Sequence, residues 1–176
     1  FEDNGDAILG GMSVKLTEDV QITSTTVGGR LNEKLVRFGN FNIPETGWMH
    51  STVAELKLTD RLQYVFQQDI LNTETIGGQG FRETYGLNQY LFHTINDCFA
   101  SGLRFEWWNV DRDAFFLTGG QEANFFALTL GANIKPHANV VVRPEIRWDW
   151  QDPSLALEDS PNDDRQTTFG IDSILV

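Results

Sequence analysis

Six charged residues stand at alternate positions in two stretches of the sequence, and they are the side chains best placed to do chemistry. Residues two apart on an extended strand point to the same face, so each stretch would present its charges together. A third stretch lies between them in the sequence, and its corresponding positions, such as Ala127, Thr129 and Gly131, are mostly small. If that face lines a barrel, the charges flank a shallow track. The six residues are Arg104, Glu106, Arg143, Glu145, Arg147 and Asp149.

Two interpretations of these charges stay open. Buried charges must be paired, and the alternating signs of Arg143, Glu145 and Arg147 allow self-neutralising ladders. Charges that line a water-filled pore need only solvent, and they can bias which ions pass. The first interpretation is structural, whereas the second makes these residues pore-lining.

Catalytic arrangements are weak in this sequence. His50, His93 and His137 fall on separate segments, and there is no HExxH, CxxC or GxSxG motif. His50 and Ser51 are neighbours, but adjacent residues on a strand point to opposite faces and cannot act together. We therefore expect no enzyme activity and no catalytic residues.

Cofactor, metal and nucleic-acid sites are not indicated either. The glycine pairs at 28–29, 77–78 and 119–120 lack a Walker lysine, which argues against phosphate binding. The acidic stretch 158–164 lacks the spacing of a calcium loop. We interpret it as a solvated loop with at most weak divalent-cation binding. A net charge of −12 argues against nucleic-acid binding. We expect no cofactor and no structural or catalytic metal.

The stretch 124–150 shows which elements carry the charges. Apolar and other residues alternate with period two in both halves, which predicts two strands joined by a short turn. Leu128, Leu130, Val142 and Ile146 share the apolar phase, opposite the charges. Strands of about ten residues are long for a soluble sheet but suit a tilted strand that crosses a bilayer.

Similar hairpins recur along the chain. Three residues separate the apolar ends of three short turns, and five separate those of a fourth. Directly opposed residues share a face, so these odd spacings keep the apolar faces of paired strands matched. The predicted opposed pairs are Leu16 with Val20, Leu58 with Leu62, Leu56 with Tyr64, Ala54 with Phe66, Ile95 with Phe99 and Ile134 with Val140.

Nine strands follow from this pattern, with short turns at one end and long connections at the other, as in outer-membrane barrels. The expected strands are 7–16, 20–30, 48–58, 62–72, 83–95, 99–110, 124–134, 140–150 and 167–176. We interpret residues 1–176 as a single all-β domain, an antiparallel transmembrane β-barrel. Bacterial single-chain barrels use an even number of strands, so we expect further strands before Phe1. This chain would then be the C-terminal portion of a larger barrel.

Tryptophans separate a membrane barrel from a soluble one. All five lie at the long-loop ends of strands, and four share the apolar phase: Trp48, Trp107, Trp148 and Trp150. This placement predicts the aromatic girdle found where strands leave the hydrocarbon. In a soluble ligand-binding barrel, tryptophans would be spread through the strands.

Two segments resemble a known family. They are 85–108, which contains YGLNQYLFHTIND and GLRFEWW, and 130–150, which contains LGANIKP and VRPEIRWDW. Both resemble the OmpL-like outer-membrane β-barrel porin family, best over residues 83–150. These motifs are strand and turn signatures, so the resemblance implies fold and location, and it brings no catalytic residues. Family members are longer than this chain.

We therefore expect an outer-membrane porin of a Gram-negative-type envelope, a passive channel for small hydrophilic solutes or ions. Its partners would be membrane lipids and those solutes, and homo-oligomerisation stays open. A non-conducting structural or adhesive barrel is the second hypothesis, and a soluble ligand-binding β-barrel is the third.

Overall fold

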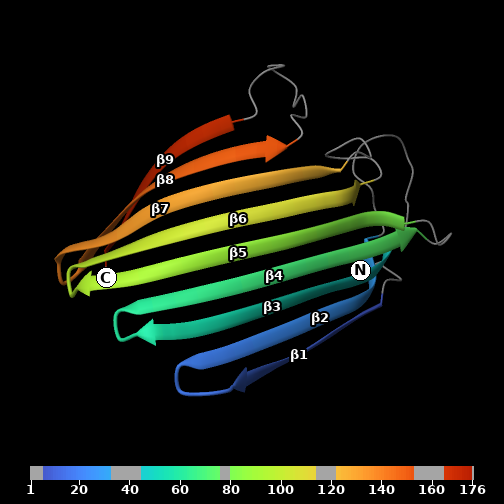
Figure 1. Cartoon of the computed structure of the whole chain (residues 1–176), viewed down its shortest axis with the longest axis horizontal. Coiled ribbons are helices and arrows are strands. Elements are labelled where there is room, and N and C mark those ends of the chain that lie inside the picture. Colours follow the sequence, from blue (N-terminus) through green and yellow to red (C-terminus); the bar gives the residue numbers. More distant parts are fainter. Residues whose placement is uncertain (1–5, 33–44, 76–79, 114–121, 153–164, 176) are drawn as a thin grey trace.

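The computed structural model describes residues 6–32, 45–75, 80–113, 122–152 and 165–175. They form one antiparallel sheet of nine strands in sequence order, so every strand pairs with its neighbours along the chain (Figure 1). The all-β prediction and the number of strands are confirmed. No helix in the described part is long and apolar enough to cross a membrane. The strands are β1 (Ala7–Lys15), β2 (Val20–Asn32), β3 (Glu45–Thr59), β4 (Leu62–Thr75), β5 (Gly80–Asn96), β6 (Phe99–Asp113), β7 (Ala123–His137), β8 (Val140–Asp152) and β9 (Arg165–Leu175).

Most strands are longer than the sequence pattern predicts, chiefly at the long-loop end. β5 begins at Gly80 rather than at residue 83, and β6 runs to Asp113 rather than to residue 110. Backbone hydrogen bonds do not depend on side-chain type, so a ladder continues beyond the last residue of the apolar pattern. Period-two hydrophobicity therefore marks only the middle of each strand.

The short turns correct the predicted pairing at two hairpins. Thr59, not Leu58, pairs with Leu62, and Asn96, not Ile95, pairs with Phe99, each across a two-residue turn. A register shift follows in both hairpins, between Lys57 and Thr59 in the first of them. Such a bulge places two residues opposite one and absorbs the extra residue. Beyond the bulge the predicted pairs Leu56–Tyr64 and Ala54–Phe66 are confirmed.

The turn between β7 and β8 is also tighter than predicted. Ile134 pairs with Val142 rather than Val140, while His137 pairs with Val140. A shift of two residues keeps side chains on the same face, so the apolar faces still match. The first hairpin agrees with the prediction, because the Leu16 N–H donates to the Val20 carbonyl oxygen at 2.9 Å.

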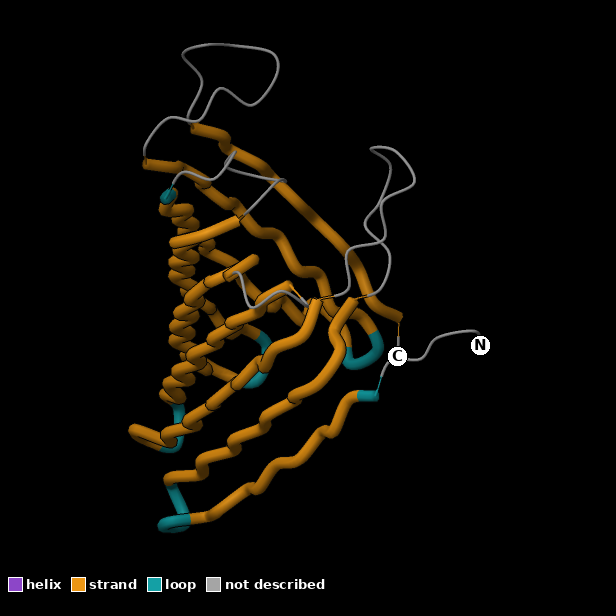
Figure 2. The backbone as a smooth tube through the Cα atoms, turned by 90° about the vertical axis from the view of Figure 1, so that its right-hand side faces the viewer, coloured by secondary structure: helices purple, strands orange, loops and turns teal. Residues whose placement is uncertain are grey.

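The sheet bends into an open trough (Figure 2). Within the described residues, β1 and β9 each pair on one side only, so the sheet is not closed. Two hollows in the trough are lined mainly by side chains of the polar phase, the phase that carries the charged residues. This phase therefore forms the concave face. The apolar phase forms the convex face.

Apolar side chains on the convex face remain exposed. Leu130 is 45% exposed, Ile171 65% and Phe169 68%. The fully buried apolar side chains of the described part are few, and they include Val110 and Ala123 near the long-loop end. A contiguous apolar surface of this kind marks a membrane or interaction surface rather than a surface that faces water.

Candidate functional site

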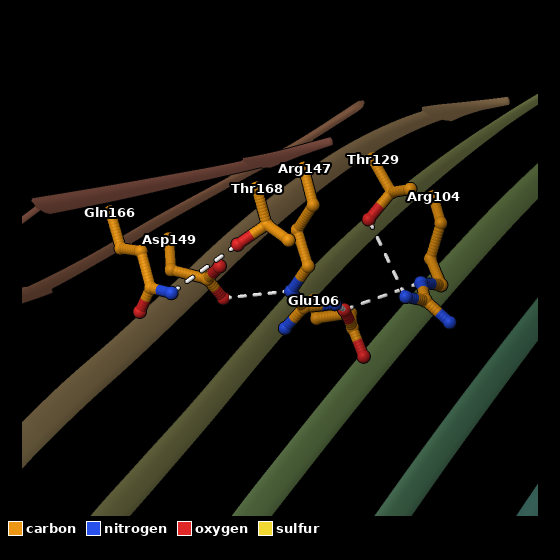
Figure 3. Close-up of polar contacts among 7 residues, drawn as sticks. All are labelled: Arg104, Glu106, Thr129, Arg147, Asp149, Gln166 and Thr168. Atoms are coloured by element: carbon orange, nitrogen blue, oxygen red, sulfur yellow. Dashed lines mark hydrogen bonds and ion pairs between the residues drawn. The ribbon is translucent and has the colours of Figure 1, made fainter. Parts of the chain in front are cut away.

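The concave face brings four of the predicted pore-lining residues into contact, and we call them the charged row: Arg104, Glu106, Arg147 and Asp149 (Figure 3). Glu106 Oε2 contacts both guanidinium groups, at 3.2 Å from Arg104 Nε and in a shorter contact with Arg147 Nη1. Arg147 Nε donates to Asp149 Oδ1 at 2.8 Å. The signs alternate along the row, so each charge has an opposite neighbour.

Strand register and residue size together allow this contact. Arg104 and Arg147 lie opposite the same residue of β7, Thr129, while Glu106 and Asp149 lie opposite Ala127. Both β7 residues are small and buried, at 6% and 3% exposed. The long side chains of β6 and β8 therefore meet above β7 instead of standing apart on either side of a track.

The charged row is partly open to solvent, which sets the strength of its ion pairs. Its side chains are between 27% and 35% exposed. Arg104 Nη2 also lies 3.4 Å from Thr129 Oγ1. Arg104 Nε is buried, and among the described residues its contact with Glu106 is an ion pair without hydrogen-bond geometry. The contribution of such partly exposed ion pairs to stability lies between that of weak surface pairs and that of buried pairs, whose desolvation is costly.

The two remaining predicted residues lie nearer the short-turn end. Arg143 makes a two-point contact with Asp172 of β9, and Nε to Oδ1 is 2.8 Å. Glu145 lies beside Gly170, where an added Cβ would come within 3.3 Å of its side chain. Asp172 was missed by the sequence analysis. Its phase, opposite to Phe169 and Ile171, is the signal that could have found it.

Two hollows lie along the concave face. One, of about 770 Å³, is bordered by Phe92, Arg143, Glu145 and Asp172, and glycines form part of its floor. The other, of about 440 Å³, lies at the charged row and reaches Trp108 and Asp69. Both combine ionised groups with aromatic rings. Such surfaces can interact with water and with polar solutes.

The predicted girdle residues lie on the convex face. Trp107, Phe126 and Trp150 are opposed in register, and the rings of Phe126 and Trp150 stack at 5.5 Å. The indole N–H of Trp107 donates to Asn124 Oδ1 at 2.9 Å. A large apolar ring with a polar contact at the strand end suits a membrane–water interface. Trp48 and Trp148 share the same phase on β3 and β8.

Trp108 differs from its neighbour. It points to the concave face and packs against Phe125, with ring centroids 5.2 Å apart. It is 38% exposed. The aromatic band therefore includes one tryptophan that faces the interior of the trough.

Among the described residues, no group of three or more His, Cys, Asp and Glu side chains could hold a metal ion. Gly29 has φ of 136°, and an added Cβ would lie 2.3 Å from the Asp6 carbonyl oxygen, so this glycine has a structural role. The glycine pairs at 77–78 and 119–120 and the acidic stretch 158–164 lie outside the described residues.

A comparison with protein families identifies the chain. The family described as "Putative beta-barrel porin-2, OmpL-like" matches residues 1–176. The chain belongs to this family. The resemblance of segments 85–108 and 130–150 is thereby confirmed, and it extends over the first 80 residues as well. Membership supports a porin-like outer-membrane barrel. No curated protein matches the chain.

Proposed function

We propose that this OmpL-like porin chain forms part of a passive channel for small hydrophilic solutes or ions in the outer membrane. One observation carries the proposal: the two faces of the sheet have opposite chemistry. The concave face holds paired charges and two hollows, whereas the convex face exposes apolar side chains. Transmembrane barrels that conduct have a polar interior and an apolar exterior of this kind.

The charge pairs on the concave face support passive diffusion rather than catalysis. Each arginine of the charged row has a carboxylate partner, so neither sign of charge dominates this part of the lining. We propose no enzymatic activity, no cofactor and no metal. The partners of the chain are then lipids on the convex face and solutes on the concave face.

Single-channel recording tests conduction. Purified protein added to a planar lipid bilayer should give stepwise current increases, and heat-denatured protein should give none. A folded, membrane-inserted protein without current steps would favour the second hypothesis, a structural or adhesive barrel. Folding would be checked by the difference in electrophoretic mobility between heated and unheated samples.

Detergent dependence tests the membrane assignment itself. A chain with an apolar convex face should remain monodisperse only in detergent or lipid and should precipitate when detergent is removed. A soluble ligand-binding barrel would stay in solution, and this result would overturn the proposal.

A further inference from the structure

Polar side chains interrupt the convex face on β2, β3 and β4. The register places Ser24 opposite Thr52, Thr52 opposite Gln68, and Thr26 opposite His50. All are in the same phase as the apolar residues Ala54 and Phe66, so they belong to the convex face. We call this group the polar patch: Ser24, Thr26, His50, Thr52 and Gln68.

The polar patch lies within the span that should meet hydrocarbon. On β3, His50 and Thr52 stand between Trp48 at the long-loop end and Leu56 at the short-turn end. On β4, Gln68 stands between Ile70 and Phe66. On β7 and β8 the middle of the convex face is apolar. On β5 Gln89 is a single polar residue of this face, whereas in the patch polar side chains gather on three adjacent strands.

Hydrogen bonds inside the patch provide partners for only some of its polar groups. Thr26 Oγ1 lies 2.7 Å from His50 Nδ1, and Thr52 Oγ1 lies 3.0 Å from His50 Nε2. Ser24 Oγ makes a longer contact of 3.4 Å with the same nitrogen. The Gln68 amide has no hydrogen-bond partner among the described residues. An unpaired amide in hydrocarbon costs several kcal/mol, so lipid is a poor neighbour for it.

Small residues border part of the patch, whereas Met12 lies opposite Ser24. Gly10 lies opposite Thr26, and an added Cβ there would meet no atom within 4 Å. Gly28 and Ala54 flank the patch along β2 and β3. In membranes, small residues let neighbouring elements approach closely, and polar side chains then bond across the contact.

We propose that the polar patch is the surface at which a second copy of this chain packs against the first within the membrane. The patch carries no acidic, lysine or arginine side chain, so two copies do not repel each other there. Its hydroxyl, imidazole and amide groups each donate and accept hydrogen bonds, which makes the patch complementary to itself. Self-complementarity is what a symmetric contact between identical chains requires. The proposal relies on lipid around the convex face but not on conduction.

Cysteine cross-linking locates the contact. All variants are made in a Cys98→Ser background, because Cys98 is an exposed free thiol in the β5–β6 turn. Thr52→Cys in that background should yield a cross-linked dimer with a short bis-maleimide in native membranes. The control is Leu128→Cys, on the convex face of β7, which should remain uncross-linked. Absence of a Thr52→Cys dimer, or an equal yield from the control, would overturn the proposal.

Replacement by apolar residues tests the chemistry. His50→Leu combined with Gln68→Leu makes the patch compatible with lipid and removes its hydrogen bonding. Native mass spectrometry should show oligomers for the unaltered protein and mainly monomers for this variant. The control is Gln89→Leu, because Gln89 is also convex but is already bonded to the Tyr64 hydroxyl at 2.9 Å. This variant should keep the oligomer.

Two outcomes separate this proposal from the proposed function. A monomeric unaltered protein that conducts would refute the contact and leave the channel intact. Loss of the oligomer in the Gln89 control as well as in the patch variant would also refute the contact, since dissociation would not depend on the patch. A protein that dissolves without detergent would refute both.

Discussion

At the scale of single residues, Glu106 connects the charged row. Its Oε2 contacts both Arg104 and Arg147, and its side chain is 27% exposed. We expect Glu106→Gln to destabilise the folded protein by about 1–3 kcal/mol, between the values for surface and buried ion pairs, because Arg104 would lose its carboxylate partner and Arg147 would keep only Asp149. Urea unfolding in lipid vesicles measures this change. Glu55→Gln, on the same face but exposed, is the control and should change stability by less than about 0.5 kcal/mol.

The arginines of the concave face should bias ion passage if the barrel conducts. Replacing Arg104, Arg143 and Arg147 by Gln leaves the carboxylates of Glu106, Asp149 and Asp172 without their partners. These carboxylates would then dominate the lining, so the reversal potential in a salt gradient should move toward cation selectivity. Arg61→Gln, in the β3–β4 turn, is the control. An unchanged reversal potential in a conducting triple variant would contradict the pore-lining interpretation.

At the scale of elements, the two faces of the sheet can be tested by placing one charge on each of them. Leu130→Arg puts a guanidinium on the convex face and should cost roughly 2–4 kcal/mol of stability if that face meets lipid near the midplane. Thr25→Arg adds the same side chain to an exposed position of the concave face on β2, where it should cost little. Equal effects of the two substitutions would show that the faces are assigned wrongly.

The bulge at the end of β3 makes a second prediction about elements. Leu58 is the residue left without an opposed partner between Lys57 and Thr59. Deleting Leu58 should therefore preserve the face of every other residue and allow folding. Deleting Val53 in mid-strand shifts the residues on one side of the deletion by one position. The apolar side chains of that part of β3 then turn to the concave face. The mobility shift between heated and unheated samples should persist in the first deletion and disappear in the second.

At the scale of the whole molecule, two adjacent tryptophans report how the barrel sits in a membrane. Trp107 lies on the convex face, and Trp108 packs with Phe125 on the concave face. In variants with a single tryptophan, lipids with brominated acyl chains should quench Trp107 fluorescence, and aqueous iodide should quench Trp108. The reverse pattern would mean that the concave face meets lipid.

The sequence by itself determined the strands, their number and their two faces. Period-two alternation is a local property, because each residue's side is set by its position relative to its neighbours. This is why Leu130 and Arg147 could be assigned to opposite faces without a structure. The short turns, long connections and banded tryptophans also depend only on local chemistry, and together they predicted a transmembrane barrel. The family was predicted from the resemblance of segments 85–108 and 130–150, and its model matches the whole chain.

Only the tertiary structure decided which residues meet. The side chains of Arg104 and Arg147 come from strands separated by β7, and their contact through Glu106 depends on registers that bulges and turns set. The pairing of Arg143 with Asp172 and the hydrogen bonds of His50 depend in the same way on cross-strand opposition. A one-residue change in a turn moves every opposed pair, whereas the hydrophobic pattern along each strand stays the same. Contacts between strands therefore follow from register, which the turn spacing predicted for pairs such as Leu56–Tyr64 but not for the side chains of the charged row.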